Sequence, residues 1–382
     1  MSVESGHRII PVRSRRDLRR FIDFPFRLYK GSPWWVPPLR VDVAATLNPK
    51  KNPFFAHGSL QAFLAVDDAD RVVGRIAGIV NGNHLRKYDD DLGFFGFFDC
   101  VERYETAAAL LDAAAGYLKD RGLRVLRGPA SPTLNDTAGL LVEGFDRRPC
   151  LMMPYNPSYY EEYLLQWGMQ RVMTMLAYYV HARYVQVDRL RRGAAIVHRR
   201  NDGLTIRTLD MSRFDDEARI VRNIFNDAWA NNWGFVPVTE EEFAHLAKDM
   251  KPLLDSRLAT IVEKDGEPVA FSVAIPDVNE VLRKLRNGRL LPFGILKLIL
   301  TLKLAGTADL RIPLMGVRKK YQGRAFDVLL VLATTERSIE IGYHGCEMGW
   351  ILDTNNVLKN LLASIGGVVD KEYALFERSV DS

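Results

Sequence analysis

The stretch LMGVRKKYQGRAFDVLL (314–330) decides the fold of the second half of the chain. Its first residues are apolar and favour the end of a strand, and its last residues have the apolar periodicity of a helix. A helix start offers N–H groups without intrahelical partners and the positive end of the helix dipole, so the loop between the two is suited to bind phosphate. Four cations in the loop add charge for the same phosphates: Arg318, Lys319, Lys320 and Arg324.

Regular elements on both sides of this stretch predict an α/β domain. Apolar alternation and turn residues favour strands over these ranges: 204–209, 258–263, 268–275, 308–317, 346–352 and 368–377. Helical periodicity favours helices over these ranges: 214–229, 239–250, 326–341 and 355–364.

The first half repeats this layout. A hairpin is expected at 60–66 and 72–80, followed by a strand at 92–100, a helix at 102–121 and a strand at 123–127, and then by a helix at 159–167 and a strand at 173–180. The shared order suggests an internal duplication. We therefore expect an N-terminal domain over 1–182, a basic connector over 183–203 and a C-terminal domain over 204–382.

Composition and charge exclude several classes of protein. The chain has 382 residues, of which 47% are hydrophobic and 26% charged, so it is not a disordered or low-complexity protein. Cys100, Cys150 and Cys346 are scattered without a CxxC pair, which excludes a disulfide framework and a zinc knuckle. No secretory signal or membrane span is readable, so we expect a cytoplasmic protein that is soluble or peripheral to the membrane.

Lysine and arginine gather in two segments, 8–40 and 283–311. Neither segment carries a nucleic-acid-binding motif, so we expect no nucleic acid partner. Phosphate-bearing cofactors and an anionic membrane face remain as partners.

The element order and the loop at 314–330, with MGWILDTNNVLKNLLASIGG (348–367), are similar to the Gcn5-related N-acyltransferase fold. The resemblance implies two tandem domains of this type, each a mixed, mostly antiparallel sheet flanked by helices. It also implies that the loop binds the pyrophosphate of coenzyme A. Counted from Lys320, the glycine positions of the family motif fall on Gly323 and Ala325; counted from Gln322, they fall on Ala325 and Asp327. We prefer the first register.

The residues expected to bind the coenzyme are Met315, Gly316, Val317, Arg318, Lys319, Lys320, Gln322, Gly323, Arg324, Ala325 and Asn355. Two departures from the family pattern matter. Asp327 places a negative charge near the pyrophosphate, and Leu362 stands where a tyrosine often serves as general acid. The corresponding junction of the first half, FFDCVERYETAA (97–108), has no glycine and carries acids. We therefore expect one coenzyme A site, in the second half, with the first half as a wall for the substrate.

Longer motifs resemble one family of tandem-domain acyltransferases, the bacterial ceramide synthase-like family. They are FIDFPFRLYKGSPWWVPPLR (21–40), LGFFGFFDC (92–100), GPASPTLNDTAGLLVEGFDRRPCLMMPYNPSYYEEYL (128–164), WGFVP (233–237) and GWILDTNNVL (349–358). The resemblance implies transfer of a fatty acyl group from acyl-CoA, as co-substrate, to the amine of a sphingoid base, 3-oxosphinganine or sphinganine. No permanently bound cofactor or metal is expected. The alternatives are acylation of another small amine and a non-catalytic acyl-CoA sensor.

An insertion at 276–309 supports a lipid substrate. If 291–304 is helical, Lys297 and Thr301 form a narrow polar stripe on an otherwise apolar surface. Such a helix suits a membrane interface or the wall of an acyl tunnel, and it equally suits burial between domains.

Acyl transfer to an amine needs a group that removes a proton from the ammonium. The candidates are Asp353 and Glu347, six residues apart on the strand expected beside the thioester, Asp99 at the end of the corresponding first-half strand, and His57 in a loop. Cys346 is expected to be a buried structural residue. Polar groups for the sphingoid head group are expected from Asn135, Asp136, Tyr155, Asn156, Tyr159, Tyr160 and Trp350. For the tyrosines, packing with an exposed hydroxyl is the competing interpretation.

Overall fold

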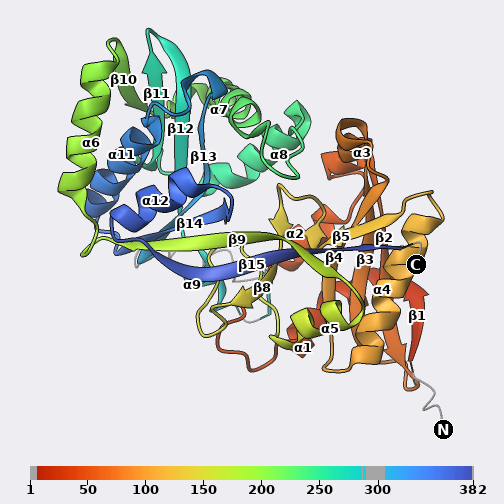
Figure 1. Cartoon of the computed structure of the whole chain (residues 1–382). Coiled ribbons are helices and arrows are strands. Elements are labelled where there is room, and N and C mark those ends of the chain that lie inside the picture. Colours follow the sequence, from red (N-terminus) through yellow and green to blue (C-terminus); the bar gives the residue numbers. More distant parts are fainter. Residues whose placement is uncertain (1–6, 286, 290–305, 381–382) are drawn as a thin grey trace. The chain divides into compact units, whose positions relative to one another are not determined.

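The computed structural model describes residues 7–285, 287–289 and 306–380. It divides into two compact units. Of the described residues, unit 1 comprises 7–174, 279–285, 287–289 and 372–380, and unit 2 comprises 175–278 and 306–371 (Figure 1). The division runs through two strands, β9 (Gln170–His181) and β15 (Val368–Ser379), so it differs from the boundaries expected at 182 and 204.

The sheet of unit 1 has the order β1-β2-β3-β4-β5-β15. Its pairs are antiparallel except for β4 and β5, which run parallel over three residue pairs beginning at Leu92 and Val125. Its elements are β1 (His7–Pro11), α1 (Arg15–Leu28), α2 (Arg40–Thr46), β2 (Gly58–Asp67), β3 (Val72–Asn81), α3 (Gly82–Tyr88), β4 (Leu92–Cys100), α4 (Tyr104–Lys119), β5 (Val125–Gly128), β6 (Ala130–Ser131), β7 (Thr137–Ala138), β8 (Leu140–Glu143), α5 (Tyr159–Gln166) and α9 (Asn279–Leu282).

Two layers of helices cover this sheet. On one face, Leu110, Leu111 and Ala114 of α4 pack against Ile76 and Phe95 and exclude water from the core. Helix α1 lies on the opposite face, where Arg75 of β3 donates a hydrogen bond to the carbonyl of Phe21. A capping box of Ser14 and Asp17 fixes the start of α1.

The sheet of unit 2 has the order β10-β11-β12-β13-β14-β9. Only β13 and β14 are parallel. Its elements are α6 (Val187–Arg200), β10 (Leu204–Thr208), α7 (Phe214–Trp229), α8 (Glu240–Met250), β11 (Ala259–Lys264), β12 (Glu267–Pro276), β13 (Asp309–Val317), α11 (Phe326–Ile341), β14 (Gly345–Leu352) and α12 (Asn356–Ser364).

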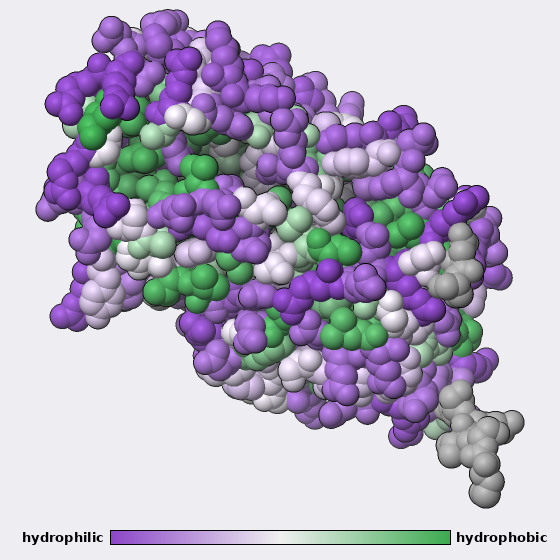
Figure 2. Space-filling view, viewed as in Figure 1, coloured by the Kyte–Doolittle hydropathy of each residue, from purple (hydrophilic) through white to green (hydrophobic). Residues whose placement is uncertain are grey.

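The helices of unit 2 also form two layers. Helix α11 packs on one face, and Ala194 and Val197 of α6 join its cluster with Phe326 and Leu329. Helix α7 covers the other face, where Ile224 and Phe225 contact Phe271 of β12. In Figure 1, α6 and α11 lie side by side along one edge of unit 2, and Figure 2 shows that this edge is mostly hydrophilic.

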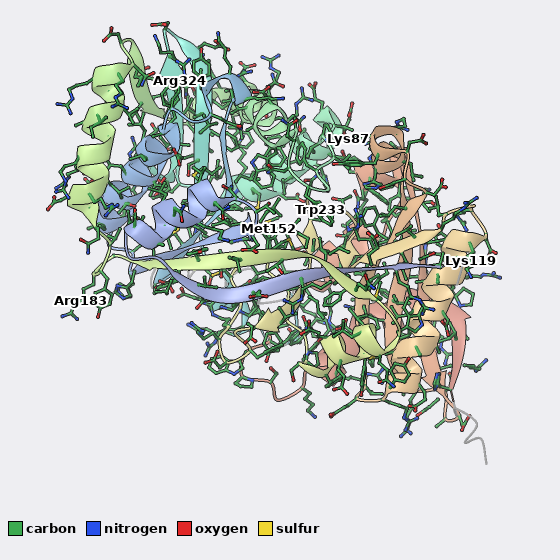
Figure 3. The ribbon with its side chains drawn as sticks, in the orientation of Figure 1. Lys87, Lys119, Met152, Arg183, Trp233 and Arg324 are labelled. Carbon is green, nitrogen blue, oxygen red and sulfur yellow. The ribbon has the colours of Figure 1, made fainter. Side chains whose placement is uncertain are left out.

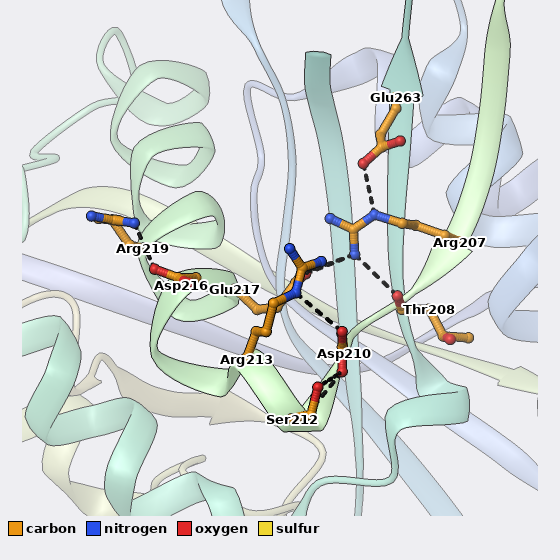
Figure 4. Close-up of polar contacts among 9 residues, drawn as sticks. All are labelled: Arg207, Thr208, Asp210, Ser212, Arg213, Asp216, Glu217, Arg219 and Glu263. Atoms are coloured by element: carbon orange, nitrogen blue, oxygen red, sulfur yellow. Dashed lines mark hydrogen bonds and ion pairs between the residues drawn. The ribbon is translucent and has the colours of Figure 1, made fainter. Parts of the chain in front are cut away.

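The first turn of α7 is tied to the edge of the sheet by charged groups (Figure 4). The carboxylate of Glu217 is 1% exposed and accepts hydrogen bonds of 3.0 Å from Arg207 of β10. Arg207 also donates to Glu263 of β11 at 2.7 Å. Since both carboxylates share one guanidinium, this network fixes the position of α7 relative to β10 and β11.

These observations confirm the predicted fold class, and both halves of the chain show the predicted order of hairpin, strand, helix, strand, helix and strand. The last strand of each half is exchanged, because β9 pairs with β14 of unit 2 and β15 pairs with β5 of unit 1. Two segments contain regular elements that were not predicted from the sequence. The segment 183–203, expected to be a basic connector, contains α6, whose apolar face is buried on α11. The segment 128–160 contains β6, β7 and β8, and β8 pairs with β15.

The helix predicted at 291–304, with Lys297 and Thr301, lies outside the described residues. Within the described part of the chain, the helices are all too short or too polar to cross a membrane.

Candidate functional site

The strands β13 and β14 part within unit 2. They are paired from Asp309 and Gly345 up to Ile312 and Met348, and no pair follows. Beyond this point β13 stays on β12 as far as Val317, and β14 stays on β9 as far as Leu352. The backbones of 313–317 and 349–352 are therefore not paired with each other as strands, so their N–H and C=O groups on these sides have no ladder partner.

The loop that follows β13 has the backbone geometry expected of the preferred register. Gly323 has φ +77° and Ala325, the residue before α11, has φ +60°. Both small residues adopt the left-handed conformation that disfavours large side chains. Tyr321 is buried and stacks on Phe326 with ring centres 5.8 Å apart, which anchors the loop to the first turn of α11.

The end of α7 supports the same loop. The carboxylate of Asp227 accepts a hydrogen bond of 2.8 Å from the N–H of Lys319. The side chain of Gln322 donates to the carbonyls of Ala228 and Val317 at 3.1 Å. Trp229 donates from its indole to the carbonyl of Met315 at 3.0 Å. The side chain of Gln322 therefore stabilises the loop by hydrogen bonds within the protein. The carbonyl of Met315 already accepts a hydrogen bond from Trp229.

Asp327 lies in the first turn of α11. Burial raises the pKa of its carboxylate, and the nearby backbone N–H groups of Asp327 and Val328 offset part of that rise. A pyrophosphate at this helix start would use the same N–H groups. The negative charge of Asp327 therefore lies where the sequence indicated that it would oppose the binding of a pyrophosphate.

The four cations of the loop differ in availability. Arg318 donates to the carbonyl of Pro268 at 2.9 Å and is directed to β12. Lys319, Lys320 and Arg324 are exposed, and none of their charged side-chain groups forms an ion pair with a carboxylate of the described residues. Figure 3 shows Arg324 at the end of unit 2 where α11 begins, close to the helix N-terminus that would receive a phosphate.

A buried carboxylate lies next to the point where the strands part. Glu347 is 1% exposed, and its Oε1 is 3.6 Å from Nε of Arg311 on β13. Neither carboxylate oxygen accepts a hydrogen bond from the described residues. Burial raises the pKa of Glu347, and the positive charges of Arg311 and Lys371 offset part of that rise. A desolvated carboxylate without hydrogen bonds is a strong proton acceptor.

Three other candidates are near this strand. The Trp350 ring is 5.9 Å from the guanidinium carbon of Arg311, and its indole N–H is buried without a partner among the described residues. Asp353 follows the end of β14, is exposed and pairs with Lys359. It does not share a strand face with Glu347, because β14 ends at Leu352 and its register shifts after Met348. Asn355, expected to bind the coenzyme, caps α12 by accepting a hydrogen bond from the N–H of Leu358.

The remaining catalytic candidates lie in unit 1. Asp99 is buried, and its carboxylate accepts hydrogen bonds from Tyr29 at 2.7 Å and from Arg75 at 2.8 Å. Burial raises its pKa, and Arg75 opposes that rise. His57 ends a short 3-10 helix, with its ring 5.5 Å from that of Phe54. The geometry thus gives Asp99 a structural role.

The expected head-group residues of the first half make internal hydrogen bonds. Asn156 is buried and bonds both backbone groups of Leu141, and the carboxylate of Asp136 accepts from Thr133. Asn135 donates its N–H to the hydroxyl of Thr133, and Tyr155 donates to the carbonyl of Phe145. The hydroxyls of Tyr159 and Tyr160 both bond the backbone of Cys100 at the end of β4. These contacts brace the 128–160 segment and use the polar groups assigned to substrate.

Sequence reasoning missed Arg311 and the supporting residues Asp227 and Trp229. Arg311 had a signal in the sequence, because it is a charged residue between the apolar residues Leu310 and Ile312 of the strand DLRIPLMGV. Asp227 and Trp229 had none, because their roles depend on the packing of α7 beside the loop. Burial raises the pKa of the Cys346 thiol, which suits the structural role expected of it.

Comparison with known proteins places the chain. No family model matches it. It is 37% identical over 371 residues to protein YghO of Escherichia coli (strain K12), covering 96% of this chain and 94% of the relative. It is 35% identical over 381 residues to the bacterial ceramide synthase of Caulobacter vibrioides (strain NA1000 / CB15N), covering 97% of each chain.

Solved structures agree on the fold. A tandem GNAT protein from the clavulanic acid biosynthesis pathway matches with a TM-score of 0.57, 13% identity and coverage of 98% of both chains. The glucosamine N-acetyltransferase region of a fungal β-N-acetylglucosaminidase matches with a TM-score of 0.59 and 12% identity, over 97% of this chain and 38% of that one. With the two relatives, these matches establish that the chain belongs to the bacterial ceramide synthase-like family of tandem Gcn5-related N-acyltransferase proteins.

Proposed function

We propose that the protein transfers a fatty acyl group from acyl-CoA to the amine of a long-chain sphingoid base, 3-oxosphinganine or sphinganine. The coarser assignment, an N-acyltransferase, follows from its fold and family. The relative named bacterial ceramide synthase, similar over nearly the whole chain, supports the choice of substrates.

The observation that carries the proposal is Glu347, a carboxylate that is 1% exposed and accepts no hydrogen bond from the described residues. It lies one residue before the point where β13 and β14 part, on the opposite face of the sheet from Met348. An ammonium group brought to this point would supply the missing hydrogen bonds and lose a proton to the carboxylate. The raised pKa of Glu347 makes it a better base at neutral pH.

The remaining steps follow from the same geometry. The neutral amine forms a bond to the thioester carbonyl carbon, the carbon–sulfur bond breaks with its electron pair on sulfur, and the new amide nitrogen releases its extra proton to solvent. Leu362 offers no proton to the departing thiolate. A thiol has a pKa of about 8.5, so its thiolate leaves without a dedicated acid and takes its proton from solvent.

The loop of unit 2 is the proposed site for the coenzyme. Lys319, Lys320 and Arg324 supply charge for its phosphates, and the backbone of Met315, Gly316 and Val317 lies beside the proposed pantetheine path. Asn355 lies at the start of α12, on the other side of that path. Arg318 and Gln322 support the loop from within.

The proposal is tested by mass spectrometry of the purified protein after incubation with palmitoyl-CoA and either sphinganine or 3-oxosphinganine. An N-palmitoyl product with either base supports the proposal. The base that is acylated faster shows whether acylation takes place on 3-oxosphinganine or on sphinganine. Product with a short polar amine and none with a long-chain base would favour the small-amine alternative. Saturable binding of palmitoyl-CoA with no product from any amine would favour a sensor, which the position of Asp327 and the presence of Leu362 also suit.

A further inference from the structure

The basic segment before the second half forms helix α6, and the proposed reaction does not use it. Between Arg183 and Arg200 the chain carries six arginines and one acid, Asp188. The helix orients these residues firmly, because Leu190, Ala194 and Val197 are buried against the rest of unit 2. The opposite face is therefore held toward solvent.

Four arginines form a stripe on that outer face. Arg189, Arg192 and Arg199 are three and seven residues apart, so they lie on one side of a helix, with Arg200 beside them. All four are exposed, and none has an acidic partner among the described residues. Arg191, by contrast, lies toward α11 and pairs with Glu336 and Asp188, which are the acids closest to it.

Apolar side chains accompany the arginines. Ile196 is 41% exposed and lies four residues after Arg192, within the stripe. Tyr184, in the turn before the helix, is 62% exposed. Arg183 precedes it and projects away from the ribbon in Figure 3. We name Arg189, Arg192, Ile196, Arg199 and Arg200 the α6 surface.

We propose that the α6 surface docks on a membrane that contains anionic phospholipid. Unpaired arginines are attracted to the negative potential of such a membrane, and their long side chains let an aliphatic neighbour approach the lipid. Ile196 and Tyr184 favour a membrane over nucleic acid, because a phosphate backbone offers no partner to an exposed aliphatic chain, whereas the interface of a bilayer does.

Docking through α6 would also bring the proposed coenzyme loop close to the membrane, because α6 and that loop belong to one core cluster. Ala194 and Val197 share a core cluster with Tyr321 and Phe326 of the coenzyme loop, so the α6 surface and this loop belong to one rigid part of unit 2. Docking would hold the loop near the membrane, where long-chain amines and acyl-CoA accumulate. This inference goes beyond the proposed reaction and does not depend on it, because binding is measured without turnover.

The test is sedimentation of the full chain with vesicles. One set contains phosphatidylcholine alone, and in the other about a third of the lipid is phosphatidylglycerol. We expect binding to the anionic vesicles only, weakened by salt. Changing Arg189, Arg192, Arg199 and Arg200 together to Gln should lower the partition coefficient more than a hundredfold, since each basic residue near such a surface contributes about fivefold. Ile196→Ser should lower it by a smaller factor.

A matched variant carries the same change in net charge away from α6. It replaces Arg16, Arg71, Arg219 and Arg257, which are exposed and paired with Asp70, Asp67, Asp216 and Asp255, by Gln. It should keep most of the binding. Three results would overturn the proposal. The two fourfold variants could lose binding to the same extent, or the α6 variant could bind as tightly as the unchanged protein. The third is that the unchanged protein does not bind anionic vesicles. Arginine-dependent binding of a DNA duplex without vesicle binding would also overturn it.

Discussion

The two units share an order of elements and differ at the junction where their parallel strands end. In unit 2, β13 leads through Gly323 and Ala325 into α11, with three exposed cations whose charged side-chain groups form no ion pair with a carboxylate of the described residues. In unit 1, β4 leads into α4 without a glycine, and Tyr159 and Tyr160 bond the backbone of Cys100 at its end. One fold thus has a basic junction with two small residues in the left-handed conformation in unit 2 and a braced junction in unit 1.

The buried carboxylates of the two units differ in the same way. Asp99 of unit 1 accepts hydrogen bonds from Tyr29 and Arg75. Glu347 of unit 2 has Arg311 at 3.6 Å and accepts no hydrogen bond from the described residues. A carboxylate with its partners in place stabilises a structure, whereas one without them is available to a substrate.

The largest expected effect is on catalysis in unit 2. Glu347→Gln should lower kcat/KM for acyl transfer by about 10²–10³-fold, because it removes the base while keeping the shape. Since burial raises the pKa of Glu347, activity of the unchanged protein should fall as pH decreases through that raised pKa. The residual activity of the variant should lack this dependence.

Asp353→Asn is the control for this change, because Asp353 is exposed and paired with Lys359. It should alter kcat/KM less than threefold, on the order of a surface ion pair. If Asp353→Asn abolished activity and Glu347→Gln did not, the roles assigned to the two carboxylates would be reversed.

The next effect is on the stability of unit 1. Arg75→Met removes the guanidinium partner of Asp99, whose side chain and that of Arg75 are each 10% exposed. It should lower the free energy of unfolding in urea by about 3 kcal/mol, because a buried charge loses its partner. Arg71→Met, which breaks the pair with Asp67 at an arginine that is 74% exposed, should cost less than about 1 kcal/mol. Equal losses would show that burial of Asp99 does not matter.

A smaller loss is expected for the equivalent change in unit 2. Arg207→Met leaves Glu217 buried beside Arg213, which is 3.7 Å away and remains as a weaker partner. The free energy of unfolding should fall by about 2 kcal/mol. Arg219→Met, at the exposed pair with Asp216, should leave it nearly unchanged. If Arg207→Met lowered the free energy of unfolding more than Arg75→Met does, the expectation that the loss is larger in unit 1 than in unit 2 would be wrong.

The smallest expected effect concerns the coenzyme loop. Asp327→Asn removes a negative charge from the first turn of α11 and should tighten binding of coenzyme A about fivefold, measured by calorimetry. Asp215→Asn, in the first turn of α7, makes the same change away from the loop and should leave the affinity unaltered. Weaker binding by Asp327→Asn would mean that this carboxylate contributes to the site.

Most strands and helices of the two sheets were predictable from sequence, because each apolar pattern is local and has the period of its element. The loop at 314–330 was predictable for the same reason. β1, α1, α2 and α3 were not among the predicted elements. Helix α6 was not predicted because its apolar face is narrow. It consists of Leu190, Ala194 and Val197, and the many arginines between them obscure the helical periodicity of the apolar residues. The distinction between Asp99 and Glu347 was not predictable, since it depends on Arg75, Tyr29 and Arg311, which approach from other elements.

The central claim is that only unit 2 binds coenzyme A, and calorimetric titration of the full chain with palmitoyl-CoA tests it most directly. We expect one site per chain. Changing Lys319, Lys320 and Arg324 together to Gln should weaken it at least tenfold. The same change at Lys87, Arg103 and Lys119 of unit 1, of which Lys87 and Lys119 are labelled in Figure 3, should leave it unaltered. Two sites per chain, or a site lost with the cations of unit 1 and kept without those of the loop, would contradict the claim.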